Sequence, residues 1–228
     1  MLPKSTGLGA FVVWVAGVAL AGCDGWMDES ADTVDMTTLD PADLADHLVL
    51  ETDSYRLDQA VQEGGTAGER MVQDAIQSAC SIAGEPDAAT ARKVAELARA
   101  SYTPPPGGPR LGSWRRGSEL ARSGFGFRVG HRTDDHDRRD PGGNCYACHQ
   151  MDPAEVTYGT LGPSLVGYGR ERGTDAAVVS YLHELITNPH QYFPCTNMPR
   201  FGAQGVLTEE QISHIMAYLL DPESPVNE

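Results

Sequence analysis

The segment Gly-Asn-Cys-Tyr-Ala-Cys-His at residues 143–149 places two thiols and an imidazole within about one and a half helical turns. This is the spacing of the c-type haem attachment motif. Cys145 and Cys148 would add to the two haem vinyl groups as thioethers, and His149 would bind the iron. The motif predicts one covalent haem c, and it constrains the fold because the chain must cover both faces of a large flat cofactor.

Two other kinds of site also use closely spaced cysteines. A zinc knuckle needs a second Cys/His pair at similar spacing, and His183 with His190 is a poor match. A thioredoxin-like site needs a βαβ context. No segment of this sequence alternates convincingly with a period of two, which predicts a mostly helical domain. The sequence therefore favours haem over both alternatives.

The N-terminus resembles an export signal, because Lys4 precedes an apolar run from Leu8 to Ala21. This run is shorter than the roughly 20 residues of a membrane span. Leu20-Ala21-Gly22-Cys23 resembles a bacterial lipobox, so we expect residues 1–22 to be a lipoprotein signal peptide and Cys23 to be lipidated. An ordinary signal peptide that ends near a cysteine is the alternative. Either predicts a periplasmic protein, and Asp24 resembles the residue that keeps some lipoproteins at the inner membrane.

The chain is strongly acidic, with 32 Asp and Glu residues against 17 Lys and Arg and a formal net charge of −15. Such a charge argues against nucleic acid as a partner, since DNA and RNA are polyanions. Residues 24–60 hold eleven of the acidic residues and one arginine. We therefore predict that residues 23–64 form an acidic tether.

Hydrophobic periodicity predicts a small helical extension at residues 65–105, with helices over 66–81 and 88–100. A proline- and glycine-rich linker at residues 103–109 then marks the boundary of the main domain, residues 106–228. Further helices are expected in this domain at 114–123, from a Thr174 cap to 188, and after a Thr208 capping box. The predicted fold class is mainly α, with a class I cytochrome c domain preceded by the small helical extension.

The sixth iron ligand is predicted to be Met198, which lies in a proline-bracketed segment where a loop can place a thioether on the distal haem face. His190 is the second candidate. Met151 is too near His149 to reach the opposite face, and Met216 fits the apolar face of the last helix. The remaining histidines are expected at the surface: His47, His131, His136, His183 and His214.

A proximal histidine normally donates its second ring proton to a carbonyl, which fixes its orientation. The segment Leu161-Gly162-Pro163-Ser164-Leu165 resembles the Gly-Pro-x-Leu segment of class I cytochromes c, in which the proline carbonyl accepts this proton. Pro163 is therefore predicted to help hold the haem through His149. A Gly-Pro pair that only makes a turn is the alternative.

Cys80 and Cys195 remain once the other three cysteines are assigned to lipid and haem. In an oxidising compartment we expect them to form a disulfide that pins the extension to the loop carrying Met198. Two separate thiols, or a redox-active Cys195 that carries sulfur beside the haem, are the alternatives.

Several blocks of the main domain together resemble the SoxX family. They are the haem motif, Gly162 to Leu165, Asn197-Met198-Pro199-Arg200-Phe201-Gly202, Leu207 to Ile212, and the tail Leu220-Asp221-Pro222-Glu223-Ser224-Pro225-Val226-Asn227. The resemblance implies the monohaem electron-transfer subunit of the heterodimeric SoxAX complex, an L-cysteine S-thiosulfotransferase. SoxAX oxidatively couples thiosulfate to a cysteine of the carrier SoxYZ. The reactive cysteine belongs to the SoxA subunit, so no catalytic residue is expected in this chain, and its electrons pass to a soluble cytochrome c.

A generic membrane-tethered monohaem cytochrome c of a respiratory chain is the alternative function, since both would carry the same haem. A sensor or peroxidase would need an exchangeable sixth ligand, which Met198 argues against. For partner docking, Tyr146, Ala147 and residues 198–201 are expected to border the exposed haem edge. Arg200 is expected to be either solvated or paired with an acidic partner.

Overall fold

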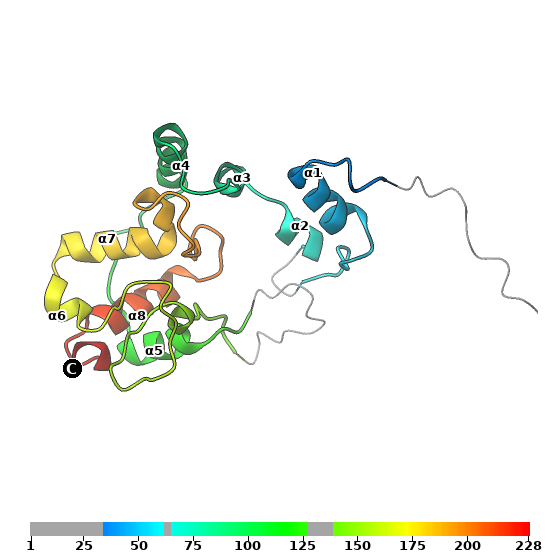
Figure 1. Cartoon of the computed structure of the whole chain (residues 1–228). Coiled ribbons are helices and arrows are strands. Elements are labelled where there is room, and N and C mark those ends of the chain that lie inside the picture. Colours follow the sequence, from blue (N-terminus) through cyan, green and yellow to red (C-terminus); the bar gives the residue numbers. More distant parts are fainter. Residues whose placement is uncertain (1–33, 62–64, 127–138) are drawn as a thin grey trace, which may run out of the picture. The chain divides into compact units, whose positions relative to one another are not determined.

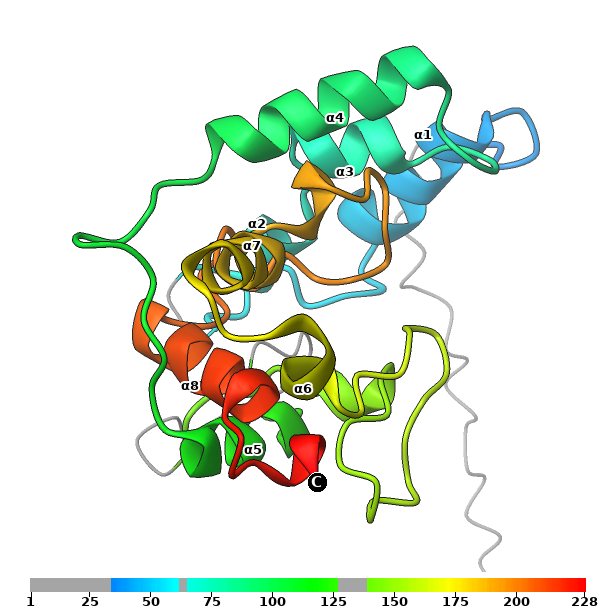
Figure 2. The same cartoon turned by 90° about the vertical axis from the view of Figure 1, so that its left-hand side faces the viewer.

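The computed structural model describes residues 34–61, 65–126 and 139–228, and Figures 1 and 2 show its elements. Residues 46–228 form one compact unit, separate from the residues before them. Across these described ranges, β pairing is limited to one isolated bridge between Ala60 and Thr66. The prediction of a mainly α chain is therefore confirmed. None of the described helices is both long and apolar enough to cross a bilayer.

The predicted acidic tether contains two short helical segments. Helix α1 spans Pro41–Asp46 and continues into a π-helical turn, η1, at His47–Glu51. Neither segment has a buried residue, so they add little to a core. The predicted signal peptide and Cys23 lie outside the described residues.

The extension contains three helices: α2 (Ala67–Met71), α3 (Ala75–Cys80) and α4 (Ala88–Ala100). The prediction of one helix over residues 66–81 is wrong, because the helical conformation ends at Met71 and a second helix begins at Ala75. Thr66 and Asp74 each form a complete capping box, so the hydrogen-bonding groups of two separate helix starts are satisfied. Ile76, Val94 and Ala98 then form a small core of their own between α3 and α4.

The main domain is built around α8, which packs against α5, α6 and α7. Figures 1 and 2 both show α5 and α8 side by side. This close approach requires Gly117 of α5, because a Cβ atom there would lie 2.0 Å from the His214 carbonyl oxygen. The elements are α5 (Trp114–Arg122), η2 (Cys145–Ala147), α6 (Tyr168–Arg172), α7 (Ala176–Thr187), η3 (Pro189–Gln191), α8 (Glu209–Leu220) and η4 (Pro225–Asn227).

Side-chain caps fix where α7 and α8 begin. The predicted capping box of α8 is present, with Thr208 accepting from the Gln211 amide. Helix α7 begins one residue later than predicted, because Asp175 rather than Thr174 accepts hydrogen bonds from the first-turn amides. The six residues from Ile215 to Leu220 are all buried, which makes the last half of α8 the centre of the main core.

His183 is buried, so the prediction that it lies at the surface is wrong. Its side chain on α7 is 1% exposed. The ring nitrogens lie 3.0 Å from the Tyr102 hydroxyl oxygen and 2.8 Å from a Glu209 carboxylate oxygen. His183 therefore joins the end of the extension to α7 and to the start of α8, and both polar nitrogens have partners.

Candidate functional site

A cavity of about 930 Å³ lies in the main domain, within the range of about 300–1,000 Å³ typical of cofactor sites. Its wall includes Cys145, Cys148, His149, Pro163 and Met198, all of which the sequence singled out. The rest of the wall is largely apolar and comes mainly from α7, α8 and the loops around residues 161 and 201. Aliphatic and aromatic members include Leu161, Leu165, Leu182, Leu185, Ile186, Phe201, Leu207, Ile215 and Leu219.

The proximal side of this cavity is formed by the short turn η2. Asn144, with φ 47°, begins the turn in the left-handed conformation that asparagine tolerates. The amides of Cys148 and His149 both donate to the Cys145 carbonyl, at 3.1 and 2.9 Å. These bonds present both thiols and the imidazole to one cavity, as thioether bonds and iron ligation require.

The His149 ring is oriented by the next segment of the chain. Its Nδ1 lies 2.7 Å from the Pro163 carbonyl oxygen. A carbonyl only accepts, so Nδ1–H donates and Nε2 is left available for a metal. Gly162 permits the approach, because a Cβ atom there would lie 2.3 Å from His149 Cε1. The Pro163 carbonyl thus accepts the hydrogen bond from His149, so the Gly-Pro pair does more than make a turn.

The distal side is formed by the loop between η3 and α8. Met198 is half-buried in this loop and packs against the main core. Its amide donates to Thr196 Oγ1 at 3.3 Å, which bends the backbone locally. Met216 is fully buried in the core, and the described residues that line the cavity include Met198 but not Met216.

His190, the second candidate for the sixth ligand, is absent from the described residues that line the cavity. Its Nδ1 accepts a hydrogen bond from the Cys195 amide at 3.0 Å. Burial, assisted by the nearby Arg200 charge, holds the pKa of His190 below its ordinary value, while Asp74 opposes the shift. His190 therefore does not line the cavity, and its hydrogen bond with the Cys195 amide helps to hold the distal loop.

The residues present fit haem c. Two thiols, one imidazole and the thioethers of Met151 and Met198 line the same apolar cavity, and Met151 is only two residues from His149, which leaves Met198 as the methionine for the opposite face. Desolvation raises the pKa of the Cys145 thiol to about 12. Once bound through these groups, haem supplies one-electron chemistry by cycling between Fe(III) and Fe(II).

The exposed rim of the cavity differs from the predicted docking edge. Ala147 and Pro199 are exposed and line the cavity as expected, but Tyr146 is buried and its hydroxyl lies 2.7 Å from that of Tyr218. Leu161 and Phe193 also border the cavity, with exposures of 69% and 53%. Their signal in the sequence is weak, because a single apolar residue in a loop is common at protein surfaces.

Arg200 is neither solvated nor free to meet a partner, so that prediction is wrong. It is 9% exposed, and its Nη1 donates to Asp74 Oδ2 at 2.6 Å. A buried guanidinium needs an opposite charge, and Asp74 of the extension supplies it.

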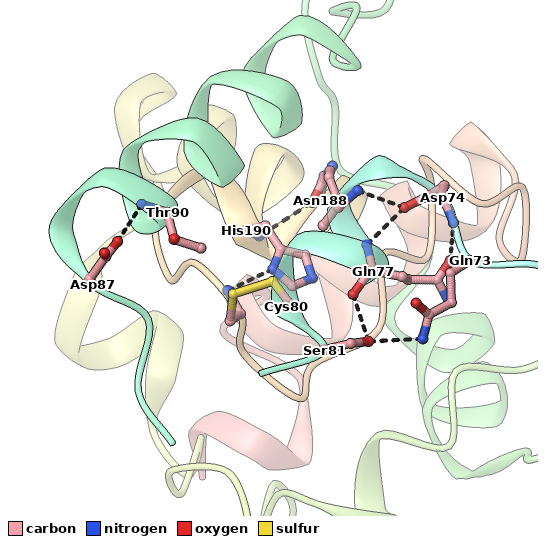
Figure 3. The surroundings of a disulfide bond; sticks show 11 residues. Gln73, Asp74, Gln77, Cys80, Ser81, Asp87, Thr90, Asn188 and His190 are labelled. Atoms are coloured by element: carbon pink, nitrogen blue, oxygen red, sulfur yellow. Dashed lines mark hydrogen bonds between the residues drawn. A yellow bond between two sulfur atoms is a disulfide. The ribbon is translucent and has the colours of Figure 1, made fainter. Parts of the chain in front are cut away.

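A disulfide joins Cys80 and Cys195, with an S–S distance of 2.17 Å. The predicted pairing of these two cysteines is therefore present. Figure 3 shows the surroundings of the disulfide, with His190 beside it. The bond links the end of α3 to the loop that carries Met198. The extension is therefore attached covalently to the distal side of the cavity.

Comparison with known proteins gives two matches. Residues 142–221 match the cytochrome c family. Over 157 residues the chain is 38% identical to an uncharacterised lipoprotein of Aquifex aeolicus (strain VF5), a match that covers 68% of this chain and 73% of that protein. The predicted covalent haem c and class I cytochrome c fold are confirmed. The chain thus belongs to the same family as this Aquifex protein, and its residues 142–221 form a cytochrome c domain that carries haem c and transfers electrons.

Proposed function

We propose that this protein is a lipid-anchored, SoxX-like electron-transfer subunit that acts with a SoxA-type cytochrome in the oxidation of thiosulfate. The observation that supports electron transfer is that Cys145, Cys148, His149 and Met198 all line one largely apolar cavity. In this proposal His149 and Met198 are the two axial ligands of a low-spin haem. A filled sixth position favours electron transfer over catalysis at the iron.

The sequence blocks that resemble SoxX support the choice of thiosulfate chemistry. One block is the Met198 loop on the cavity wall, and another is the C-terminal segment. In that segment Ser224 Oγ donates to the Tyr218 carbonyl at 2.5 Å, and Asn227 Nδ2 donates to the Leu219 and Asp221 carbonyls at 3.1 and 2.9 Å. The tail therefore has a structural role, closing the end of α8 through carbonyls that the helix leaves unpaired.

The number of electrons released in the coupling determines how many electron transfers this subunit must make. Joining thiosulfate to a cysteine thiol forms one S–S bond and releases two electrons and one proton. One haem accepts one electron at a time, so two successive transfers to a soluble cytochrome c complete each coupling. In this proposal the S–S bond joins the outer sulfur of thiosulfate to the SoxYZ thiol, the reaction takes place at the partner's reactive cysteine, and this chain contributes no catalytic residue.

Attachment to the periplasmic face of a membrane, the inner membrane in this proposal, follows from Cys23. The name of the Aquifex relative, a lipoprotein, supports the lipobox interpretation. A diacylated cysteine contributes two buried chains, which is what stable anchoring requires. Cys23→Ser should move the protein from the membrane fraction to the soluble periplasmic fraction. If the variant stays in the membrane fraction, the anchor lies elsewhere.

The thiosulfate role is tested with the purified holoprotein. A SoxA-type haem protein should co-purify with this chain, and thiosulfate with SoxYZ should reduce its haem only when that partner is present. The alternative, a generic membrane-tethered cytochrome c of a respiratory chain, would be reduced by a respiratory donor without thiosulfate. Reduction by that donor alone, with no SoxA-type partner in the purified material, would reject the SoxX-like role and leave electron transfer intact.

A further inference from the structure

Helix α3 is attached to the distal loop at two points, one on each side of Met198. Its last residue, Cys80, is bonded to Cys195, three residues before the methionine. At its other end the Asp74 carboxylate accepts from Arg200, two residues after the methionine. Figure 3 shows Asp74 and Cys80 at the opposite ends of this helix. A six-residue helix therefore spans the segment that carries the thioether.

The two carboxylate oxygens of Asp74 have different tasks. Oδ1 caps α3, accepting from the amides of Ile76 and Gln77 at 2.9 and 3.0 Å. Oδ2 accepts from Arg200 Nη1 at 2.6 Å and from Gln204 Nε2 at 3.0 Å. Capping α3 requires only the first oxygen, so the contacts of the second oxygen serve the distal loop.

Charge strengthens the attachment at Arg200. The guanidinium is almost fully buried and is paired with Asp74 across 126 residues of chain. Although burial raises it, the pKa of Asp74 lies below its ordinary value because the Gln77 amide and the Arg200 guanidinium stabilise the carboxylate. Hydrogen bonds to charged groups are stronger than neutral ones.

The loop itself needs such support. Cys195 has φ 59°, a left-handed conformation that is uncommon for a residue with a side chain. The segment continues without regular secondary structure until α8 begins at Glu209. A loop restrained at both flanks loses less conformational entropy when its methionine binds, so ligation is favoured by preorganisation.

We propose that α3 is a two-point clamp that holds the Met198 thioether at the haem iron, with Asp74 as a positioning residue for that ligand. The inference rests on the proposed assignment of Met198 as sixth ligand. It gives the N-terminal extension a role in the redox site, beyond linking the cytochrome c domain to the membrane.

Asp74→Asn separates the two tasks of Asp74. Asparagine caps a helix about as well as aspartate, so α3 is retained. The amide nitrogen that replaces Oδ2 cannot accept from Arg200 or Gln204. Asp87→Asn is the matched control, because Asp87 caps α4 through the Thr90 amide at 2.7 Å and its substitution removes the same charge from the same extension.

The measurement is the rate at which imidazole replaces the methionine at the ferric iron of the holoprotein. Asp74→Asn should raise this rate about tenfold, as expected for losing a charged hydrogen bond, and should lower the reduction potential. Asp87→Asn should leave both values unchanged. Equal effects of the two variants would assign the change to net charge and overturn the clamp.

The second attachment is tested by replacing both disulfide cysteines, Cys80→Ser with Cys195→Ser, alone and together with Asp74→Asn. Because either attachment alone still restrains the loop, the combined variant should speed imidazole binding by more than the product of the two separate factors. Arg200→Lys, which keeps a positive donor, should give a smaller effect than Asp74→Asn. A strictly multiplicative result would mean that the attachments act independently and would contradict a shared clamp.

The spectrum of Met198→Ala distinguishes failure of the ligand assignment from failure of the clamp. Loss of the methionine-to-iron charge-transfer band in Met198→Ala, with an unchanged imidazole rate in Asp74→Asn, overturns the clamp and leaves the ligand assignment standing. Retention of the band in Met198→Ala overturns the ligand assignment and the clamp with it.

Discussion

The two sides of the haem cavity are held in place in different ways. On the proximal side, the orientation of His149 depends on a turn of its own segment and on Pro163, only 14 residues away. On the distal side, the loop of Met198 depends on partners 115 and 126 residues distant, Cys80 and Asp74. The position of His149 thus depends on residues nearby in the sequence, whereas the loop of Met198 is attached to the extension.

The comparison is tested most directly at the distal ligand. Met198→Ala should abolish the methionine-to-iron charge-transfer band near the red end of the spectrum and lower the reduction potential, because methionine ligation raises it. The spectrum of the purified ferric holoprotein checks this. His190→Ala should keep the band, since His190 is outside the cavity wall. The reverse pattern would exchange the roles of the two residues.

The next largest effect is expected on the stability of the extension. Removing the disulfide with Cys80→Ser and Cys195→Ser should lower the free energy of unfolding by up to about 4.7 kcal/mol, because the unfolded chain is no longer cross-linked over a long loop. Denaturant unfolding of the oxidised protein measures it. Ser78→Ala, at an exposed position of α3, serves as control. An unchanged unfolding midpoint would show that other contacts hold the extension equally well.

The proximal side is tested at Gly162. A Cβ atom there would lie 2.3 Å from His149 Cε1 and 2.6 Å from Nδ1. Gly162→Ala should therefore shift the imidazole from Pro163 and cost about 1–3 kcal/mol of stability. Unfolding of the holoprotein measures the cost, and Thr160→Ala at an exposed site of the same loop is the control. If both variants are equally stable, the close approach to His149 does not constrain the loop.

The smallest effect is a pH dependence of the distal side. Burial and Arg200 lower the pKa of His190, so the unfolded chain binds the proton more readily than the folded chain does. The contribution of neutral His190 to the free energy of unfolding is therefore complete above the pKa of the unfolded chain, about 6.5. It decreases as the pH falls below that value. Wild type should lose more unfolding free energy than His190→Gln between about pH 7.5 and about pH 5.5. If the free energy of unfolding of the two proteins changes equally with pH, His190 does not cause the pH dependence.

The parts that could be predicted from the sequence are those with local signals. The haem motif, the capping box at Thr208 and the helix over residues 88–100 each depend on residues within a few positions of one another. The break between α2 and α3 also has a local signal, since Thr66-Ala-Gly-Glu69 and Asp74-Ala-Ile-Gln77 are two capping boxes. The continuous apolar period across them pointed to one helix instead.

The missed features depend on pairs that the sequence does not bring together. Arg200 is buried because Asp74, 126 residues earlier, neutralises it. His183 is buried because Tyr102 and Glu209 satisfy both of its ring nitrogens. An isolated arginine or histidine is better solvated at the surface, so a prediction without knowledge of the partners places both there.

The disulfide also bears on how the protein is assembled. If the chain crosses the membrane from its N-terminus, as the proposed export signal implies, Cys80 is the first to emerge of the four cysteines that follow Cys23. Cys145 and Cys148 then emerge before its native partner, Cys195. Four thiols allow three pairings, and oxidation in order of emergence would join the wrong ones. The native bond therefore requires either that the haem cysteines be kept reduced until their thioethers form, or that an early mispaired bond be exchanged by thiolate attack. Maturation of the haem and of the extension are then one ordered process.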